Sequence, residues 1–445
     1  MELLMQYIWQ HRLWLPTDMT TVDGRRVDVI DPGLLNTGSG PDFFNAKIRI
    51  GSKLWAGNVE MHVRATDWHR HGHDHDRAYD SVILHVVARD DGRILRPGGE
   101  EIPQVVMPCT ADFSRIYNEM VNDPVSQLPC ARHIAALPHI YLTDWLTALA
   151  FERLYEKSDR AADYVRNAHG DWGEAIYIVL ARALGFGTNS DAFERLARQT
   201  PLRKLLRHRG DIHAVEAALF GQAGLLENIP DDTDAPEYIA RLKQDYDFMA
   251  TKYGLQQPAA MSWRMGRMRP QNFPHRRIAA LARLICDGFS IGYDLLHAQN
   301  EADVRTLFDV KLHDYWKAHY NFSPANSGGS TQWHPGEHAF SKASVNTLII
   351  NVAAPVMHAY GNQTGHTDMC ERAVELLQSL KPENNTIIRL FEAAGIDCPD
   401  AFTSQALIQL RRNYCEPRKC LYCRIGHRYL ATRAIRRDIN VGKND

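Results

Sequence analysis

The 445-residue sequence predicts an α+β protein, in which a mixed α/β region is followed by a mostly α-helical region. Residues 23–110 alternate short β-rich runs with turns that contain Gly and Pro, a pattern typical of a sheet. Further along the chain, apolar residues recur at i, i+3, i+4 and i+7, which indicates amphipathic helices. Three prolines between residues 124 and 138 separate the two patterns. The sequence therefore predicts two domains, at residues 1–120 and 139–445.

The N-terminal domain is expected to begin with an amphipathic helix at residues 1–14, which are mostly apolar. Four strands are expected after it, at residues 25–31, 43–50, 52–63 and 80–89. The centre of the last strand is almost wholly apolar, as in a strand that is buried on both faces. The strand before it alternates in polarity, so one of its faces is expected in the core and the other in a cleft.

The second domain is expected to be an irregular helical domain. Helical periodicity is clearest at residues 142–165, 172–187, 191–209, 235–254, 276–296 and 370–380. These segments do not repeat at a fixed period, so the sequence does not predict a solenoid.

Composition limits the classes of function. The net charge of −2 excludes nucleic-acid binding through the charge of the whole protein, so any such contact must be local. No stretch reaches the ~18 consecutive apolar residues of a membrane span, and no membrane contact is expected. The apolar N-terminus has no small-residue cleavage site, and the eight cysteines accompany no export sequence. We therefore expect a cytoplasmic protein with reduced thiols.

The first candidate site lies in the N-terminal sheet. Asp42 opens one predicted strand and Glu60 lies in the next, so a hairpin through Gly51 would bring the two carboxylates together. Glu60 and His62 are two residues apart in a strand and therefore share a face. Converging carboxylates suit a hard divalent cation, and we expect Mg²⁺ or Mn²⁺ there. A solvated turn and strand is the alternative interpretation.

Histidines follow this strand closely. His71 and His73 alternate with other residues, and such a set can bind a transition metal. We expect one of the two to fold back over Asp42 and Glu60, although a solvated histidine-rich loop is an alternative. His85 lies within an apolar strand and is expected to be an ordinary core histidine.

Pro41-Asp42 and Glu60-Met61-His62 resemble motifs of the PD-(D/E)XK nuclease superfamily. That superfamily has an acidic residue in its first helix, Pro-Asp at the start of a strand and (Asp/Glu)-x-Lys in the next strand. The resemblance implies a restriction-endonuclease-like fold for the first domain and metal-dependent cleavage of nucleic acid. It also implies that Glu2 is the acidic residue of the first helix. His62 stands where the superfamily usually has lysine, and a histidine is a weaker electrostatic stabiliser.

The chain also resembles, over its full length, an uncharacterised bacterial family catalogued as domain of unknown function 2851. The segments that carry this resemblance are residues 40–73, 79–87, 269–279 and 420–427. The resemblance implies a common fold and no established activity.

A second candidate site is an arginine-rich segment, residues 262–277, which has no acidic residue. Its arginines suit phosphate oxygens, and the last two would open a helix whose N-terminal amides also attract anions. The predicted nucleic-acid-binding residues are Arg264, Arg267, Arg269, Arg276 and Arg277. The alternative is a connector whose arginines pair with acidic helices.

A third candidate site is a cysteine-rich segment near the C-terminus. Cys415, Cys420 and Cys423 have a spacing that suits a tetrahedral metal site, with Cys398 or His427 as the fourth ligand. Zn²⁺ is one expected occupant, and an all-cysteine site could instead hold an iron–sulfur cluster. Thiols without a metal are the alternative. The isolated cysteines are expected to be ordinary core residues: Cys109, Cys130, Cys286 and Cys370.

The leading hypothesis from the sequence is a divalent-metal-dependent phosphodiesterase that acts on DNA or RNA. Asp42 and Glu60 would hold the metal, His62 would occupy the lysine position, and the arginines would bind the phosphate backbone. The rival hypotheses are a catalytically inactive protein that binds nucleic acid or protein, and a metal hydrolase acting on a small phosphorylated substrate. The sequence predicts no oligomeric state.

Overall fold

A computed structural model divides the chain into two compact units. It describes residues 1–14, 19–96, 99–107, 110–122, 128, 130–227, 229–230, 233–255, 261–324 and 336–431. Unit 1 comprises Met1–Trp145, Leu390–Ile396 and Leu410–Asp445, and unit 2 comprises Leu146–Arg389 and Asp397–Gln409. The first unit is thus longer than the expected domain, and it includes the cysteine-rich segment that we assigned to the helical domain. No helix in the described ranges is long and apolar enough to cross a membrane.

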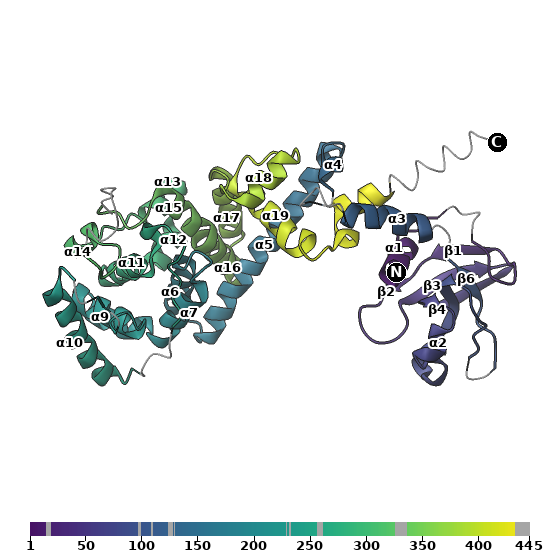
Figure 1. Ribbon diagram of the computed structural model, residues 1–445, viewed down its shortest axis with the longest axis horizontal. Coiled ribbons are helices and arrows are strands. Elements are labelled where there is room, and N and C mark those ends of the chain that lie inside the picture. Colours follow the sequence, from purple (N-terminus) through teal and green to yellow (C-terminus); the bar gives the residue numbers. More distant parts are fainter. Residues whose placement is uncertain are drawn as a thin grey trace. The chain divides into compact units, whose positions relative to one another are not determined.

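Unit 1 is built on a mixed six-stranded sheet (Figure 1). Its strands are β1 (Val27–Asp31), β2 (Leu34–Leu35), β3 (Phe43–Ile50), β4 (Lys53–Arg64), β5 (Val82–Arg89) and β6 (Gln104–Val106). The order is β1-β3-β4-β5-β6, and β2 pairs with β3. The pairs β1–β3 and β3–β4 are antiparallel, whereas β4–β5 and β5–β6 are parallel.

The expected hairpin joins β3 to β4. Ile50 pairs with Lys53, and Gly51 turns the chain with a φ of +61°, a conformation that glycine adopts without steric strain. On β4 the side chains alternate between the two faces of the sheet: Val59 and Met61 enter the main core, while Glu60 and His62 point to the opposite face.

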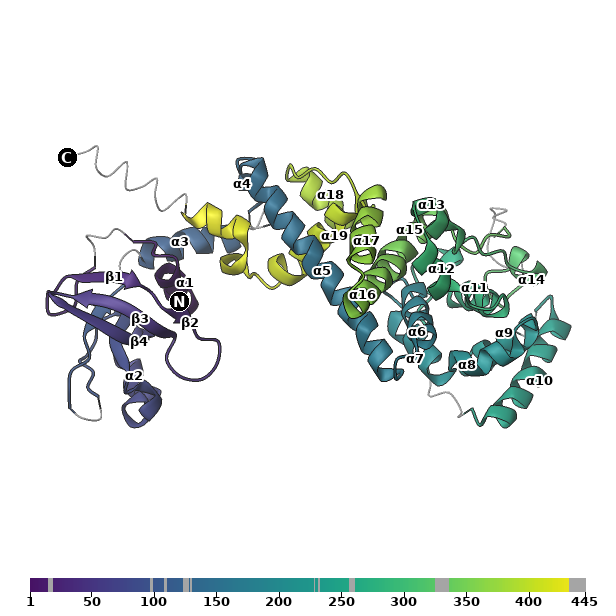
Figure 2. The same cartoon turned by 180° about the vertical axis from the view of Figure 1, so that it is seen from behind.

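Helices cover the two faces differently (Figures 1 and 2). On the main core face lie α1 (Glu2–Gln10) and α3 (Thr110–Val121), and residues near the C-terminus, Tyr429 and Leu430, join the same core. The opposite face carries the crossover from β4 to β5, which contains the one-turn helix α2 (Asp67–Arg70) and two 3-10 turns. A smaller apolar cluster around Trp68 and Tyr79 anchors this crossover.

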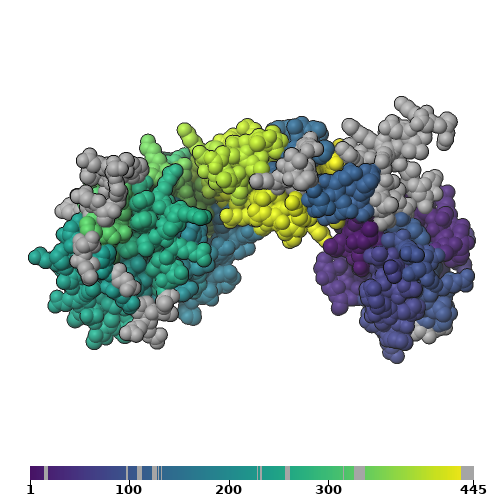
Figure 3. All heavy atoms as spheres, viewed as in Figure 1, coloured from purple at the N-terminus to yellow at the C-terminus, as the bar shows by residue number. Residues whose placement is uncertain are grey.

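Unit 2 is helical, as its sequence pattern predicts, and its helices pack as one continuous body in the space-filling view (Figure 3). The boundary between the units falls within α5 (His139–Asn167), and α18 (Thr386–Ala393) also contains a boundary. A π-helical segment, Ile349–Ala353, joins α15 to α16. The remaining helices from α6 on are α6 (Trp172–Leu184), α7 (Ser190–Gln199), α8 (Leu202–Leu205), α9 (Ile212–Gln222), α10 (Pro236–Tyr253), α11 (Pro274–Cys286), α12 (Ile291–His297), α13 (Glu301–Thr306), α14 (Asp314–Ala318), α15 (Lys342–Leu348), α16 (Ala354–Thr364), α17 (Thr367–Ser379) and α19 (Ala401–Gln409).

Candidate metal centre

Asp42 and Glu60 meet at the start of β3 through reciprocal hydrogen bonds. The backbone N–H of Asp42 donates to Glu60 Oε2 at 3.0 Å, and the N–H of Met61 donates to Asp42 Oδ2 at 2.9 Å. The other oxygen, Asp42 Oδ1, accepts from Gln6 Nε2 of α1 at 2.8 Å. Both carboxylates are therefore held in place by β3, β4 and α1, which agrees with the approach expected from the hairpin.

Burial makes these carboxylates difficult to ionise. Burial, and then the charge of Asp42, raise the pKa of Glu60 to about 9. Burial, and then the charge of Glu2, raise the pKa of Asp42 to about 6, although the hydrogen bond from Met61 opposes this rise. Glu2 thus acts on both carboxylates from α1. A bound cation would reverse the effect, because it favours the charged form of every carboxylate around it.

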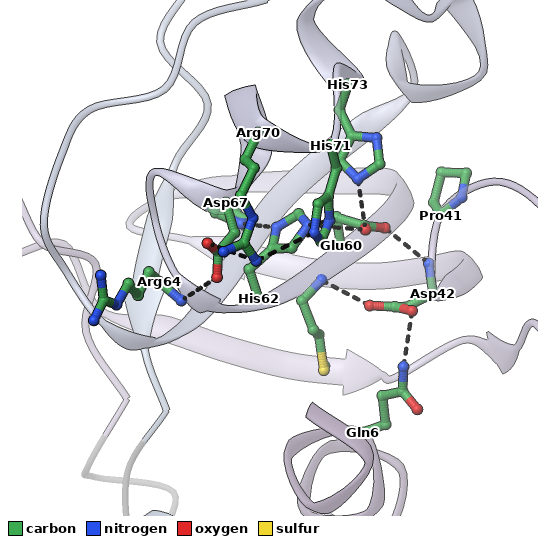
Figure 4. A network of polar contacts seen from close by, with 12 residues as sticks. Gln6, Pro41, Asp42, Glu60, His62, Arg64, Asp67, Arg70, His71 and His73 are labelled. Carbon is green, nitrogen blue, oxygen red and sulfur yellow. Dashed lines mark hydrogen bonds and ion pairs between the residues drawn. The ribbon is translucent and has the colours of Figure 1, made fainter. Parts of the chain in front are cut away.

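Three imidazoles converge on Glu60 (Figure 4). His73 Nε2 lies 3.3 Å from Glu60 Oε1, and His62 Nε2 lies 3.6 Å from the same oxygen. His71 Nδ1 lies 3.1 Å from His62 Nε2. Each of the three histidines offers a ring nitrogen within 4.8 Å of the others, and no other such set occurs in the part of the chain that the structure describes. We call Glu60, His62, His71 and His73 the histidine centre.

A chain of hydrogen bonds behind His62 fixes its tautomer. Gln104 Nε2 donates to Asp90 Oδ1 at 2.8 Å, which leaves Gln104 Oε1 to accept from His85 Nδ1 at 3.0 Å. A neutral His85 then accepts at Nε2 from His62 Nδ1, over 2.8 Å. This assignment, inferred from the network, leaves the lone pair of His62 Nε2 free for the centre. Burial, and then His85, lower the pKa of His62 to about 2, so its ring is neutral and competent as a ligand.

The crossover after β4 brings His71 and His73 back over the sheet. The single turn of α2 begins at Asp67, whose carboxylate pairs with Arg70 at 3.0 Å. Gly72 follows with a φ of +76°, so the chain reverses and His73 returns towards β4. The His73 ring then stacks on Tyr79, with 3.8 Å between ring centroids. The structure thus brings His73 to Glu60 and His71 to His62, where the sequence led us to expect one of the two histidines over Asp42 and Glu60.

His85 has a role that the sequence did not reveal. It is fully buried, as expected of a core histidine, but it also connects His62 to Gln104. The only sequence clue was its position in the strand beside His62. Parallel pairing of β4 with β5 places Glu60 opposite His85, and this register brings the His85 ring to that of His62.

The arginine-rich segment lies in unit 2, and its arginines differ in their exposure to solvent. Arg264, Arg267 and Arg269 are exposed. Arg276 and Arg277 are each 1% exposed, and both donate to backbone carbonyls within the unit: those of Trp316, Gly336 and His338 for Arg276, and that of Ala339 for Arg277. The expectation that these two bind phosphate is therefore corrected, because their guanidinium groups are already engaged inside the fold.

The cysteines expected to bind a metal near the C-terminus belong to two different units. Cys415, Cys420 and Cys423 are buried in unit 1. Cys398 belongs to unit 2, and its thiol lies 3.8 Å from the carbonyl oxygen of Asp400. His427 has its Nδ1 2.7 Å from the Tyr7 hydroxyl of α1. The His427 ring is thus engaged with α1, and Cys398 belongs to the other unit.

Comparison with known proteins supplies a family. Residues 2–386 match the model of a family described as a protein of unknown function (DUF2851), and the chain belongs to that family. No curated protein and no solved structure matches the chain.

Proposed function

We propose that this chain is a divalent-metal-dependent hydrolase whose metal is held by the histidine centre, and that its substrates are phosphodiesters of DNA or RNA. One observation carries the proposal: the Nε2 atoms of His62 and His73 both lie within 3.6 Å of Glu60 Oε1, and no lysine or arginine of the described residues pairs with that oxygen. Buried carboxylates of this kind are usually paired with cations or protonated. A divalent metal would supply the missing positive charge.

The ligand types suggest the metal. Three imidazoles and one carboxylate suit Mn²⁺, Fe²⁺ or Zn²⁺ better than Mg²⁺, which prefers oxygen ligands. Of the two ions expected from the sequence, we therefore favour Mn²⁺. A metal held by these residues would supply an activated water near neutral pH.

The surrounding residues have separate roles in this proposal. His62 is neutral, so it cannot contribute the positive charge of the lysine usually found in that position, and the metal takes over that part. Gln6 and the N–H of Met61 hold Asp42 beside Glu60 for orienting water. Arg70 has a side chain that is 69% exposed, and its Nη2 lies 3.4 Å from His71 Nε2. It is the nearest candidate to bind a phosphate.

Support for the nuclease assignment comes from the order of the elements. An acidic residue in α1 is followed by Pro41-Asp42 at the start of β3 and by Glu60-x-His62 in β4. The PD-(D/E)XK superfamily has the same order of helix, Pro-Asp strand and (Asp/Glu)-x-Lys strand. This support is a resemblance in sequence and order, and it makes nucleic acid the first substrate to test.

The test compares Glu60→Gln with His75→Ala. Both residues belong to the same acidic and histidine-rich region, but the His75 side chain is 87% exposed and its Nε2 pairs only weakly with Asp74, at 3.6 Å. Purified protein is stripped of metal, titrated with Mn²⁺, Zn²⁺ and Mg²⁺, and assayed on single-stranded and duplex DNA and RNA. We expect Mn²⁺-dependent cleavage by the wild type and by His75→Ala, and none by Glu60→Gln. Equal metal binding and equal activity in all three proteins would refute the proposed centre.

A second candidate is a metal-stabilised protein that binds nucleic acid without cleaving it. The observation that favours it is His62 in the usual lysine position, since a neutral ring provides less transition-state stabilisation. The same assay separates the two: the second candidate predicts Mn²⁺-dependent binding of DNA or RNA with no product at any metal concentration.

A further inference from the structure

Four buried cysteines of unit 1 gather from two distant parts of the sequence. Cys130 immediately precedes the short helix α4 (Ala131–Ile134). Cys415 ends a π-helical segment, Cys420 begins a 3-10 turn, and Cys423 precedes a helical stretch at residues 424–431. All four are free thiols and are between 5% and 10% exposed, at 9%, 7%, 8% and 6% in chain order. We call them the cysteine cluster.

Their proximity rests on contacts between the two segments. The ring of His133 in α4 stacks on that of Tyr429, with 4.1 Å between centroids, which brings the start of α4 beside the C-terminal helical stretch. Each of the four thiols is close enough to the other three to act on them electrostatically. Burial, and then Cys423 and Cys420, raise the pKa of Cys130 to about 12. Four buried thiols are thus placed together, and Arg411 and Arg418 act electrostatically on Cys415 and Cys420, respectively.

Backbone hydrogen-bond donors already lie around the sulfur of Cys423. The backbone N–H groups of Ile425 and Gly426 both point at it, and both lower its pKa against the effect of burial. The N–H of His427 donates to the Cys423 carbonyl at 2.8 Å, so the sulfur sits at a helix N-terminus, where negative charge is stabilised. Gly426 has no room for a side chain, because a Cβ would lie 2.1 Å from the Cys420 carbonyl oxygen.

A further donor lies beside the same sulfur. Trp145 is 7% exposed, and its Nε1 is buried with no hydrogen-bond partner among the described residues. The indole N–H faces Cys423 and favours the charged form of its thiol. A buried donor without a partner is uncommon in a folded protein. A thiolate ligand at Cys423 would satisfy it.

We infer that Cys130, Cys415, Cys420 and Cys423 together ligate one metal centre, and that this centre is an iron–sulfur cluster. A single tetrahedral Zn²⁺, with Zn–S bonds of about 2.3 Å, needs sulfur atoms about 3.8 Å apart. Among the described residues, no three of these sulfur atoms all lie within 4.8 Å of one another. Four cysteines at a wider spacing suit a cluster of several irons. Cys130, predicted to be an ordinary core residue, thus replaces Cys398 and His427 as the fourth ligand.

The experiment uses the full chain purified without oxygen. The wild type should contain about two or four irons with matching acid-labile sulfide, and it should show a visible charge-transfer band. Cys130→Ser should contain about tenfold less iron. The matched control is Cys398→Ser, which changes an equally buried cysteine of unit 2 and should retain the wild-type iron content.

A second measurement keeps the test valid if Cys130→Ser does not fold. The iron-edge X-ray absorption spectrum of the wild type should show sulfur as the only atom bonded to iron, with further iron in the next shell. Nitrogen or oxygen neighbours would assign the iron to the histidine centre and overturn the inference. So would stoichiometric zinc in place of iron, the absence of both metals, or loss of iron in Cys398→Ser.

Discussion

The histidine centre takes its groups from one sheet and the crossover beside it, between residues 60 and 73, whereas the cysteine cluster joins Cys130 to residues near 420. The first is fixed by strand register, because one hairpin and one parallel pair decide which side chains meet. The second depends on packing between segments far apart in the sequence. The difference teaches that local periodicity can place a site within a sheet, while a site between distant segments needs the tertiary fold.

The two sites also differ in chemistry, and the largest predicted effect tests this. His71→Ala removes an exposed side chain that we propose as a metal ligand, and it does so without opening a core cavity. Affinity for Mn²⁺ should fall on the order of 100-fold, by analogy with the cost of perturbing metal-site residues, while the iron content stays unchanged. Calorimetric titration and iron analysis measure the two effects. His69→Ala is the control, because His69 pairs with Asp74 at 3.1 Å and not with the centre. A parallel loss of iron would mean that the sites are one.

A variant at the second site, Gly426→Ala, should affect the cysteine cluster and leave the histidine centre unchanged. Gly426→Ala places a Cβ 2.1 Å from the Cys420 carbonyl oxygen, so the backbone that donates to Cys423 must shift. Such overpacking typically costs about 1–3 kcal/mol. We expect a lower midpoint of thermal unfolding and a smaller iron content, with unchanged Mn²⁺ affinity. Gly266→Ala provides the comparison, because this glycine of unit 2 has open space around its Cβ and, like Gly426, no positive φ. If the two alanine variants lose iron equally, the backbone donors at Cys423 do not support the cluster.

The predictable parts of the site formed by Asp42 and the histidine centre share one property. Asp42, Glu60 and His62 follow from the alternation along β4 and the glycine turn before it, both visible in the sequence. His85 is the buried core histidine that was expected, but its contact with His62 depends on the parallel pairing of β4 with β5, which no local pattern specifies.

The fold shows the same limit. The sheet-to-helix transition was predictable from periodicity, but the return of residues 410–431 to unit 1 was not. The role proposed here for Cys130 depends on the same return and could not be predicted from the sequence. Arg276 and Arg277 were expected to bind phosphate, although backbone carbonyls of a distant segment accept their hydrogen bonds. Sequence patterns describe which face of an element is apolar, and they do not identify the partner of a buried charge.

A smaller effect concerns the pH dependence of stability in metal-free protein. Glu60 has a folded-state pKa of about 9, above its ordinary value of 4.5, so between these values the folded state binds more protons than the unfolded state. Its contribution to stability is therefore complete below about pH 4.5 and is lost as the pH rises towards 9.

Denaturant unfolding between pH 7 and 8 measures this loss, since the histidines are then mostly neutral in both states. The free energy of unfolding should fall by at most about 1.4 kcal/mol per pH unit in the wild type. It should fall less in Glu60→Gln, which has no proton to lose at this position. Mn²⁺ should remove the difference in slope by favouring the carboxylate. Identical slopes without metal would show that Glu60 ionises normally in the folded chain.

The smallest effect on stability is expected at the exposed arginines. Replacing Arg267 and Arg269 together with alanine should change the free energy of unfolding by no more than about 0.5 kcal/mol, because surface substitutions rarely cost more. If the two bind phosphates, affinity should fall by a similar factor for all sequences, and the salt dependence of binding should weaken by roughly one or two units of slope. Fluorescence anisotropy at several salt concentrations measures both. Arg195→Ala with Arg203→Ala, two other arginines of unit 2, controls for the loss of net charge. An equal change in that control would assign the effect to overall charge rather than to the arginine-rich segment.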